Sequence, residues 1–180
     1  MRVTAVLVAL LITIATGWLS RAVGDSWLVP KPRIFASQFG DYGLRMIPGE
    51  PNASATLFTL NEKAEEQTAW QGPLVNIPHR VFISDNGRVV TVDTYARVGY
   101  EHALVTYDEK GKVLADYRLE DLLTAEEIKA HVVESVSSRW WNTEAQIGFS
   151  SEDGERFVIK LPWGKVIAVD LNTGKLVPQV

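Results

Sequence analysis

Short apolar runs separated by polar turns dominate the chain between His79 and Leu119. Two of these turns, Asp85-Asn86-Gly87 and Asp108-Glu109-Lys110-Gly111, place glycine where a tight hairpin needs a positive φ. A longer connection, Thr94–His102, lies between them. The pattern predicts one antiparallel sheet with four strands, at Arg80–Ser84, Val89–Asp93, Ala103–Tyr107 and Val113–Leu119.

The same turn pattern recurs on both sides of this stretch. Downstream, the turns at Phe149–Gly154 and Val169–Lys175 match the first and last turns of the predicted sheet. Upstream, Phe39–Gly43 begins a less regular copy, and Gly43 precedes Gly87 by 44 residues, a spacing typical of four-stranded blades. The sequence therefore predicts a mainly β domain of about three antiparallel four-stranded sheets over residues 34–180.

Residues 120–136 interrupt the strand pattern. Thr124 is a good N-cap, and Glu127 three residues later completes a capping box. Ile128, Val132 and Val136 then form an apolar stripe at helical spacing. We expect one amphipathic helix of about three turns over residues 124–136, inserted between the second and third sheets.

The N-terminus carries an uncharged apolar stretch, Val3–Leu19, after the basic Arg2. Small residues at Ala22-Val23-Gly24 suit cleavage before Asp25. Residues 1–24 are therefore expected to be a signal peptide or a hydrophobic helix retained as an N-terminal membrane anchor, with a buried core helix as a third alternative. Two prolines mark residues 25–33 as a linker or a peripheral strand, and the remainder is expected to lie outside the cytoplasm, in the periplasm or secreted.

Composition narrows the function classes. The 180 residues are 46% hydrophobic, enough for one ordinary core, and the formal net charge is −4. Beyond residue 24 there are 16 basic and 22 acidic side chains, which argues against a nucleic-acid partner. The chain has no cysteine, and its three histidines lack metal-site spacing. No phosphate-binding glycine motif occurs either, so we expect neither metal nor cofactor.

The connection from Asp93 to His102 gathers polar and aromatic side chains in one loop. A small ligand could contact a set formed by Tyr95, Arg97, Tyr100 and His102. Asp93 or Glu101 would then fix the imidazole of His102. The alternative is structural, with Asp93 and His102 bonding backbone groups at the ends of paired strands.

Two adjacent tryptophans, Trp140 and Trp141, follow the expected helix. If exposed, they would suit stacking on a sugar or contact with a partner. Neighbours in a strand point to opposite faces, so we expect at least one of them to be core. Farther on, Asp170–Gly174 has oxygen-bearing side chains at alternate positions, but it lacks the closing glutamate of a calcium loop, which favours a hairpin turn.

The segments ISDNGRVVTVD and VIAVDLNTGKLV resemble blades of bacterial β-propellers of the YVTN and quinoprotein-like types. Those blades share an S-x-D-G-R hairpin and a D-x-x-T-G-K hairpin. The matching positions are Ser84, Asp85, Gly87 and Arg88 for the first hairpin and Asp170, Thr173, Gly174 and Lys175 for the second. The resemblance implies a fold and no site residue, because these turns occur in enzymes, binders and scaffolds alike.

Three blades are fewer than a closed propeller needs. Two chains could complete a ring of six as a homodimer, three sheets could pack openly, or the chain could be a fragment. The expected function is a non-enzymatic protein-interaction or scaffolding module with a protein or cell-envelope partner. The alternatives are a small-ligand or carbohydrate-binding domain that uses the loop at 93–102, and a hydrolase with carboxylates in that loop.

Overall fold

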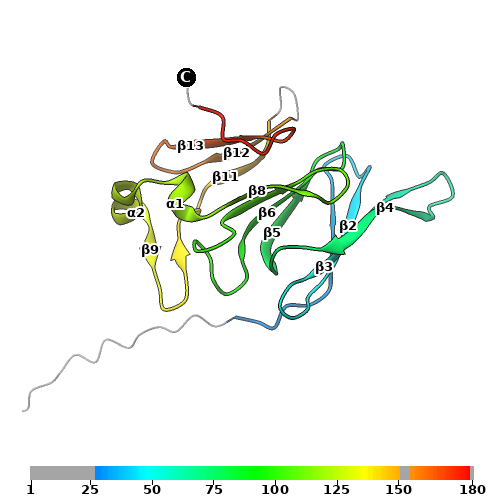
Figure 1. The fold of residues 1–180 in the computed structure, drawn as a ribbon, viewed down its shortest axis with the longest axis horizontal. Helices are drawn as coiled ribbons and strands as arrows, with labels where there is room; N and C mark the ends of the chain where they lie inside the picture. The colour runs from blue at the N-terminus through cyan, green and yellow to red at the C-terminus, as the bar shows by residue number, and fades with distance from the viewer. Residues whose placement is uncertain (1–26, 151–154, 179–180) are drawn as a thin grey trace, which may run out of the picture.

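The computed structural model describes residues 27–150 and 155–178, which form a mainly β structure (Figure 1). Strands are grouped in antiparallel sheets of four, four, three and two strands. In the three larger sheets, strands that follow one another in the chain are also neighbours in the sheet, so each sheet is a meander. The mainly β prediction is confirmed at this level.

The first sheet contains β1 (Arg33–Ala36), β2 (Gly43–Ile47), β3 (Ser54–Leu60) and β4 (Glu66–Pro73). In the β1–β2 turn Gly40 has φ +83° and donates its N–H to the Ser37 carbonyl. Gly87 makes the same bond to Ser84 in the second sheet. Gly40 is therefore the counterpart of Gly87, and the predicted alignment of Gly43 is wrong, since Gly43 already lies inside β2.

The second sheet contains β5 (Pro78–Ile83), β6 (Val89–Thr94), β7 (Leu104–Tyr107) and β8 (Val113–Tyr117). These four strands are the predicted ones, to within a few residues at each end. The predicted last strand ran on to Leu119, but the chain leaves the sheet after Tyr117 and turns into a short helix.

The third sheet has three strands instead of the predicted four: β11 (Gln146–Phe149), β12 (Arg156–Lys160) and β13 (Val166–Asp170). The fourth position is marked by an isolated bridge from Leu176 to Val169. Asp170 does form the predicted hairpin turn, in which its carboxylate accepts the backbone N–H groups of Asn172 and Thr173. Most of the predicted turn at Phe149–Gly154 lies outside the described residues.

The insertion between the second and third sheets is α1 (Leu119–Leu122), α2 (Ala125–His131), β9 (Val133–Glu134) and β10 (Arg139–Trp140). The predicted capping box is present, because Thr124 accepts the N–H of Glu127 and the Glu127 carboxylate accepts the N–H of Thr124. The predicted end at Val136 is wrong. The helix stops at His131, and the chain that follows is extended and pairs as the two-stranded ribbon β9–β10.

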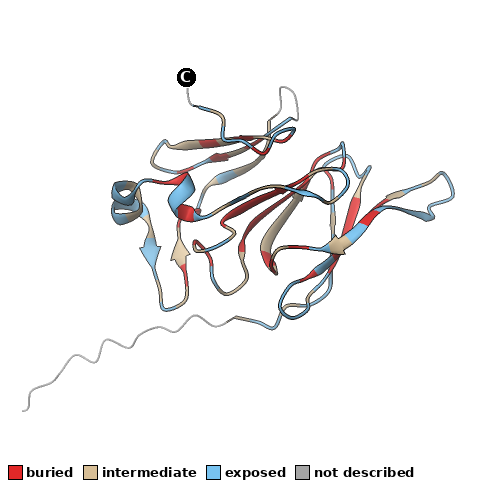
Figure 2. Cartoon of the chain, in the orientation of Figure 1, coloured by how far each residue is buried: buried red, intermediate tan, exposed pale blue. Residues whose placement is uncertain are grey.

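The core forms on both faces of the second sheet, which lies between the other two large sheets (Figures 1 and 2). Val89 and Val105 belong to a cluster shared with Leu44 and Leu57 of the first sheet. Val90, Val92 and Leu104 belong to a second cluster, shared with the third sheet, α1 and Trp141. Strand β6 is therefore buried on both faces, as its apolar pattern predicts.

A buried phenol strengthens the junction of the first two sheets. Tyr107 is fully buried, and its hydroxyl accepts the backbone N–H of Val75 at 3.1 Å. Burial raises the pKa of Tyr107 to about 12, so the hydroxyl stays protonated at neutral pH.

The predicted signal or anchor segment, residues 1–24, lies outside the described residues. Within residues 27–150 and 155–178, no helix is both long and apolar enough to cross a bilayer. Trp27 makes edge contacts with His79 and Tyr95. These two residues lie at the end of the middle sheet that is opposite to the turn at Gly87. The N-terminal part of the expected linker is therefore attached to the body of the protein through Trp27.

Candidate functional site

Asp93 organises the loop that the sequence singled out. It is completely buried, and one carboxylate oxygen accepts both the Gly99 N–H and the Trp141 indole N–H, each at 2.9 Å. The other oxygen accepts the Asn142 amide at 2.7 Å. Both oxygens are therefore occupied by protein donors, and Asp93 fastens the loop to the segment that follows β10.

The electrostatics of Asp93 follow from this burial. Removal from water raises the pKa of the Asp93 carboxyl above its ordinary value. Hydrogen bonds from Trp141, Gly99 and Asn142 favour the ionised form and offset part of the increase. Asp93 is thus a structural carboxylate, in agreement with the structural alternative for this residue, although its partners include side chains as well as backbone.

The loop needs an unusual backbone. Asp93, Ala96 and His102 all have positive φ without being glycine. Gly99 also has positive φ, and a Cβ there would lie 2.2 Å from the carbonyl oxygen of Arg139. The close approach of the loop to β10 therefore requires glycine at this position.

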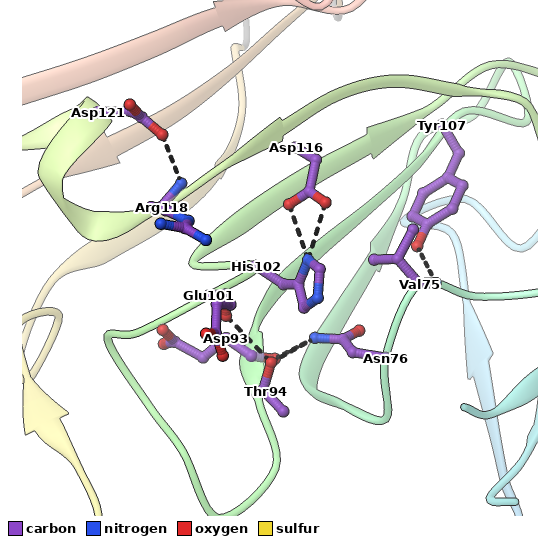
Figure 3. Close-up of polar contacts among 10 residues, drawn as sticks. All are labelled: Val75, Asn76, Asp93, Thr94, Glu101, His102, Tyr107, Asp116, Arg118 and Asp121. Atoms are coloured by element: carbon purple, nitrogen blue, oxygen red, sulfur yellow. Dashed lines mark hydrogen bonds and ion pairs between the residues drawn. The ribbon is translucent and has the colours of Figure 1, made fainter. Parts of the chain in front are cut away.

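Side-chain amide and hydroxyl groups hold the loop at its base (Figure 3). The Asn76 amide donates to the Thr94 hydroxyl at 2.8 Å, and that hydroxyl donates to the Glu101 carbonyl at 3.1 Å. The Tyr95 N–H donates to the Ile77 carbonyl. Asn76 and Ile77, in the segment before β5, thus hold the loop against the middle sheet, and the bond from Thr94 to Glu101 joins the two ends of the loop.

His102 forms a pair with a carboxylate that the sequence interpretation did not name. Its Nδ1 lies 2.9 and 2.8 Å from the two oxygens of Asp116 on β8 (Figure 3). The side chains of His102 and Asp116 are 31% and 35% exposed, so the pair is open to water. Asp116 therefore holds the imidazole, and the expectation that Asp93 or Glu101 would do so is wrong.

The remaining loop side chains gather around Tyr100. The Arg97 and Arg139 guanidinium groups lie 5.4 and 4.5 Å from the centre of its ring, within the range of cation–π contact. Arg97 also lies 3.6 Å from Glu101 and is well exposed. Arg139 is largely covered and bonds to Glu120 of α1 at 2.6 Å. This hydrogen bond from Arg139 is the main reason that the pKa of Glu120 lies below its usual value, and the positive charge of Arg139 lowers the pKa further.

One of the two adjacent tryptophans lies in the core, as expected for neighbours that point to opposite faces of a strand. Trp141 is fully buried, whereas Trp140 is half-buried and stacks on Trp27 at 5.7 Å between ring centres, with the planes 9° apart. Tyr95 is on the other side of this cluster, in edge contact with Trp27 at 5.2 Å. Of the proposed ligand contacts, Trp140 and Tyr95 thus share one aromatic cluster.

Two clefts border the insertion. The helix cleft, of about 830 Å³, has an apolar floor and a charged rim. It is lined by Glu120, Leu123, Thr124, Ala125, Ile128, Lys129, Val132, Glu134 and Arg139. The tryptophan cleft, of about 510 Å³, is lined by His131, Val133, Trp140, Trp141, Thr143, Pro162 and Trp163. The ribbon β9–β10 separates the two clefts, because its residues Glu134 and Arg139 line the first cleft and its residues Val133 and Trp140 line the second.

The tryptophan cleft is mainly aromatic. His131 stacks on Trp163 with ring centres 4.6 Å apart and planes 8° apart, which extends the aromatic surface from β12–β13 to the end of α2. Within residues 27–150 and 155–178, no group of three or more acidic, histidine or cysteine side chains is placed to hold a metal. The available chemistry in both clefts is therefore apolar contact, ring stacking and a few charges.

Sequence reasoning missed Asp116, Trp27, Ile128 and Trp163 as contributors to these surfaces. Asp116 lies in β8, which pairs with β7, the strand that His102 precedes, but the register places Asp116 opposite Val105, so strand pairing alone does not predict the contact. The position of Trp27 depends on contacts across 110 residues, such as its indole bond to the Ser137 hydroxyl, which leave no local signal. A comparison with models of known families found no match, and a comparison with curated proteins found none either.

Proposed function

We propose that the protein is a non-enzymatic, extracytoplasmic β-repeat module that binds a partner protein through the helix cleft. The observation that carries this proposal is the incomplete burial of α2, which has no fully buried residue. Ile128 of α2 and Val132, which follows the helix, pack against the edge of the core only in part, and both also line an open cleft. A monomer gains little stability from such a helix, whereas a binding surface requires accessible apolar side chains.

The rim of the helix cleft indicates the chemistry of the partner. Lys129 lies on α2, and Glu134 lies across the cleft on β9. An amphipathic segment with apolar side chains toward Ile128 and Val132, an acidic side chain toward Lys129 and a basic one toward Glu134 would match both floor and rim. We infer that such a segment of a cell-envelope protein is the partner.

Three meander sheets in series support the further proposal of propeller-like repeats. The first two sheets share strand order and the glycine turn between their first two strands. The outer face of the first sheet carries Arg45, Thr56 and Gln71 in one cross-strand row, a polar pattern that suits water. We therefore favour an open stack of three repeats over a ring completed by a second chain.

Site-specific cross-linking tests the partner proposal. A photoreactive amino acid replaces Lys129 at the helix cleft in one variant and Lys110, in an exposed turn of the middle sheet, in a control. We expect a cross-linked envelope protein from position 129 only, and loss of that product when Ile128→Ser is added. Equal cross-linking at both positions, or indifference to Ile128→Ser, would contradict the proposal.

Carbohydrate binding is the second candidate, and the tryptophan cleft is the observation that favours it. Trp140 and Trp163 offer ring faces, and His131 and Thr143 offer polar atoms. Titration with neutral and amino-sugar oligosaccharides should change tryptophan fluorescence in the unmodified chain and fail to do so in Trp163→Ala. The hydrolase alternative would instead use the His102–Asp116 pair, and it predicts an activity that His102→Ala abolishes.

A further inference from the structure

One edge of the molecule leaves several large apolar side chains in water. The Trp27 edge comprises Trp27, Leu28, Val29, Val133, Val136 and Trp140. Leu28 and Val29 are 88% and 80% exposed, and Val133 and Val136 are 68% and 70% exposed. Burying this much apolar surface is favourable, so the edge is suited to contact with an apolar phase or partner.

Contacts in the structure join these residues into one surface. Trp27 stacks on Trp140, and its indole N–H bonds to the Ser137 hydroxyl next to Val136. Trp140 pairs with Val133 across the ribbon β9–β10. The Trp27 edge is therefore continuous.

The occupant is indicated by the chain that arrives at this edge. The uncharged stretch Val3–Leu19 precedes Trp27 by only seven intervening residues. Between Trp27 and Arg33 the chain carries Lys31 and Arg33 and no acidic residue. Tryptophans beside exposed aliphatic side chains and lysine or arginine are the combination found at the boundary between lipid headgroups and acyl chains.

We propose that the Trp27 edge lies on the surface of a lipid bilayer, with Leu28, Val29 and Val136 inserted at the headgroup boundary. The inference rests on the proposed extracytoplasmic placement and on the alternative in which residues 1–24 are retained as a membrane anchor. It adds an orientation: the ribbon β9–β10 and both clefts lie near the membrane, and the β3–β4 turn around Lys63 points away from it.

Spin labelling of the full chain tests this orientation. The chain has no cysteine, so single cysteines can be introduced without other changes. Nitroxide labels are placed at Leu28→Cys and Val136→Cys, and at the exposed control positions Lys63→Cys and Lys110→Cys. Each variant is reconstituted in vesicles of phosphatidylethanolamine and phosphatidylglycerol, and its accessibility to oxygen and to a water-soluble nickel chelate is measured.

We expect the labels at 28 and 136 to be more accessible to oxygen than to nickel, and the labels at 63 and 110 to show the reverse. Adding Val136→Asp should shift the label at 28 toward nickel accessibility. The proposal is overturned if all four labels are in water on membrane-bound chains, or if the chain does not bind the vesicles. It is also overturned if 28 and 136 are shielded from both reagents with dipolar coupling between chains, which would indicate a second copy.

The cross-link from position 129 is an independent readout. If that cross-link persists while the labels at 28 and 136 are in water, membrane docking fails and the partner proposal stands. If the labels are in the membrane and the cross-link is absent, membrane docking stands and the partner proposal fails.

Discussion

The middle sheet and the insertion that follows it use amphipathic patterns in opposite ways. Strand β6 buries both of its faces, and its neighbours β5 and β7 pack beside it between two other sheets. Helix α2 buries none of its residues completely, and strand β9 is exposed at both of its residues. The difference indicates that the middle sheet provides stability and that, within the insertion, α2 and β9 provide accessible surface, whereas α1 contributes Leu119 and Leu122 to the core.

The link between these two regions is a single buried network. Asp93, at the end of β6, accepts hydrogen bonds from Trp141 and Asn142, which follow the ribbon. The backbone N–H of Arg139 in β10 donates to the Val98 carbonyl, and the next residue of the loop, Gly99, donates its N–H to Asp93. The insertion is therefore held at its base, while its helix and its ribbon remain available for contact.

The largest effect is expected at the base of the insertion. Trp141→Ala removes a fully buried side chain and one of the hydrogen-bond donors to the Asp93 carboxylate, so the free energy of unfolding should fall by about 3–5 kcal/mol. Trp140→Ala is the matched control, and because Trp140 is only half-buried it should cost about 1–2 kcal/mol. Urea unfolding measures both. Equal losses of unfolding free energy would contradict the assignment of Trp141 to the core and of Trp140 to the partly exposed surface.

A smaller loss is expected at Gly99. Gly99→Ala places a Cβ against the Arg139 carbonyl at a positive φ, which should cost about 2–3 kcal/mol. Gly148→Ala serves as the control, because no atom lies within 4 Å of its added Cβ. That control should change the free energy of unfolding by less than about 1 kcal/mol. A tolerated Gly99→Ala would show that the loop does not pack on β10.

The charge of Asp93 gives a pH-dependent prediction. Its folded-state pKa is raised, so its contribution to stability is full below the ordinary value of 3.8 and is lost as pH rises through the folded-state pKa. Asp93→Asn presents an amide to the same donors and should cost about 1–3 kcal/mol. The difference in unfolding free energy between wild type and Asp93→Asn should decrease with rising pH in this window. An increase would contradict the raised pKa.

Loss of the helix cap should have a modest effect. Thr124→Ala removes the acceptor for the Glu127 N–H, and a lost cap typically costs about 1 kcal/mol. Thr124→Ser retains the acceptor and is the control. Circular dichroism with urea unfolding gives both values. If Thr124→Ala costs several kcal/mol, α2 is part of the cooperative core and the contrast with the middle sheet is lost.

The smallest effect on stability is expected at the exposed ribbon. Val136→Ser changes a side chain that is 70% exposed, so the free energy of unfolding should change by no more than about 0.5 kcal/mol. The membrane depth of a nitroxide label at position 28 on the vesicle-bound full chain should nevertheless decrease. A large stability loss would show that Val136 supports the fold.

Local patterns predicted the middle sheet because its hairpins are specified by consecutive residues. Asp85-Asn86-Gly87 and Asp108–Gly111 set both turns, and the apolar run at Val89–Val92 reports burial on two faces. The helix start was predictable for the same reason, since Thr124 and Glu127 are three residues apart.

The remaining features depend on distant contacts. Ile128, Val132 and Val136 continue a helical period, but pairing of Val133 with Trp140 ends the helix early. Partners of Asp93 lie 48 and 49 residues along the chain, so its role as a buried anchor has no local signature. Likewise, the contact between His102 and Asp116 depends on how β7 pairs with β8. Sequence periodicity predicts that the two strands are neighbours, but it does not predict their register.

Native-state hydrogen exchange of the full chain most directly tests whether the middle sheet supplies stability and the insertion supplies surface. Amides of Val90, Val92 and Leu104 should exchange only through global unfolding, and amides of Ile128 and Val132 through local opening of much lower free energy. If the amides of α2 are as strongly protected as those of β6, the insertion belongs to the cooperative core and its role as a binding surface is contradicted.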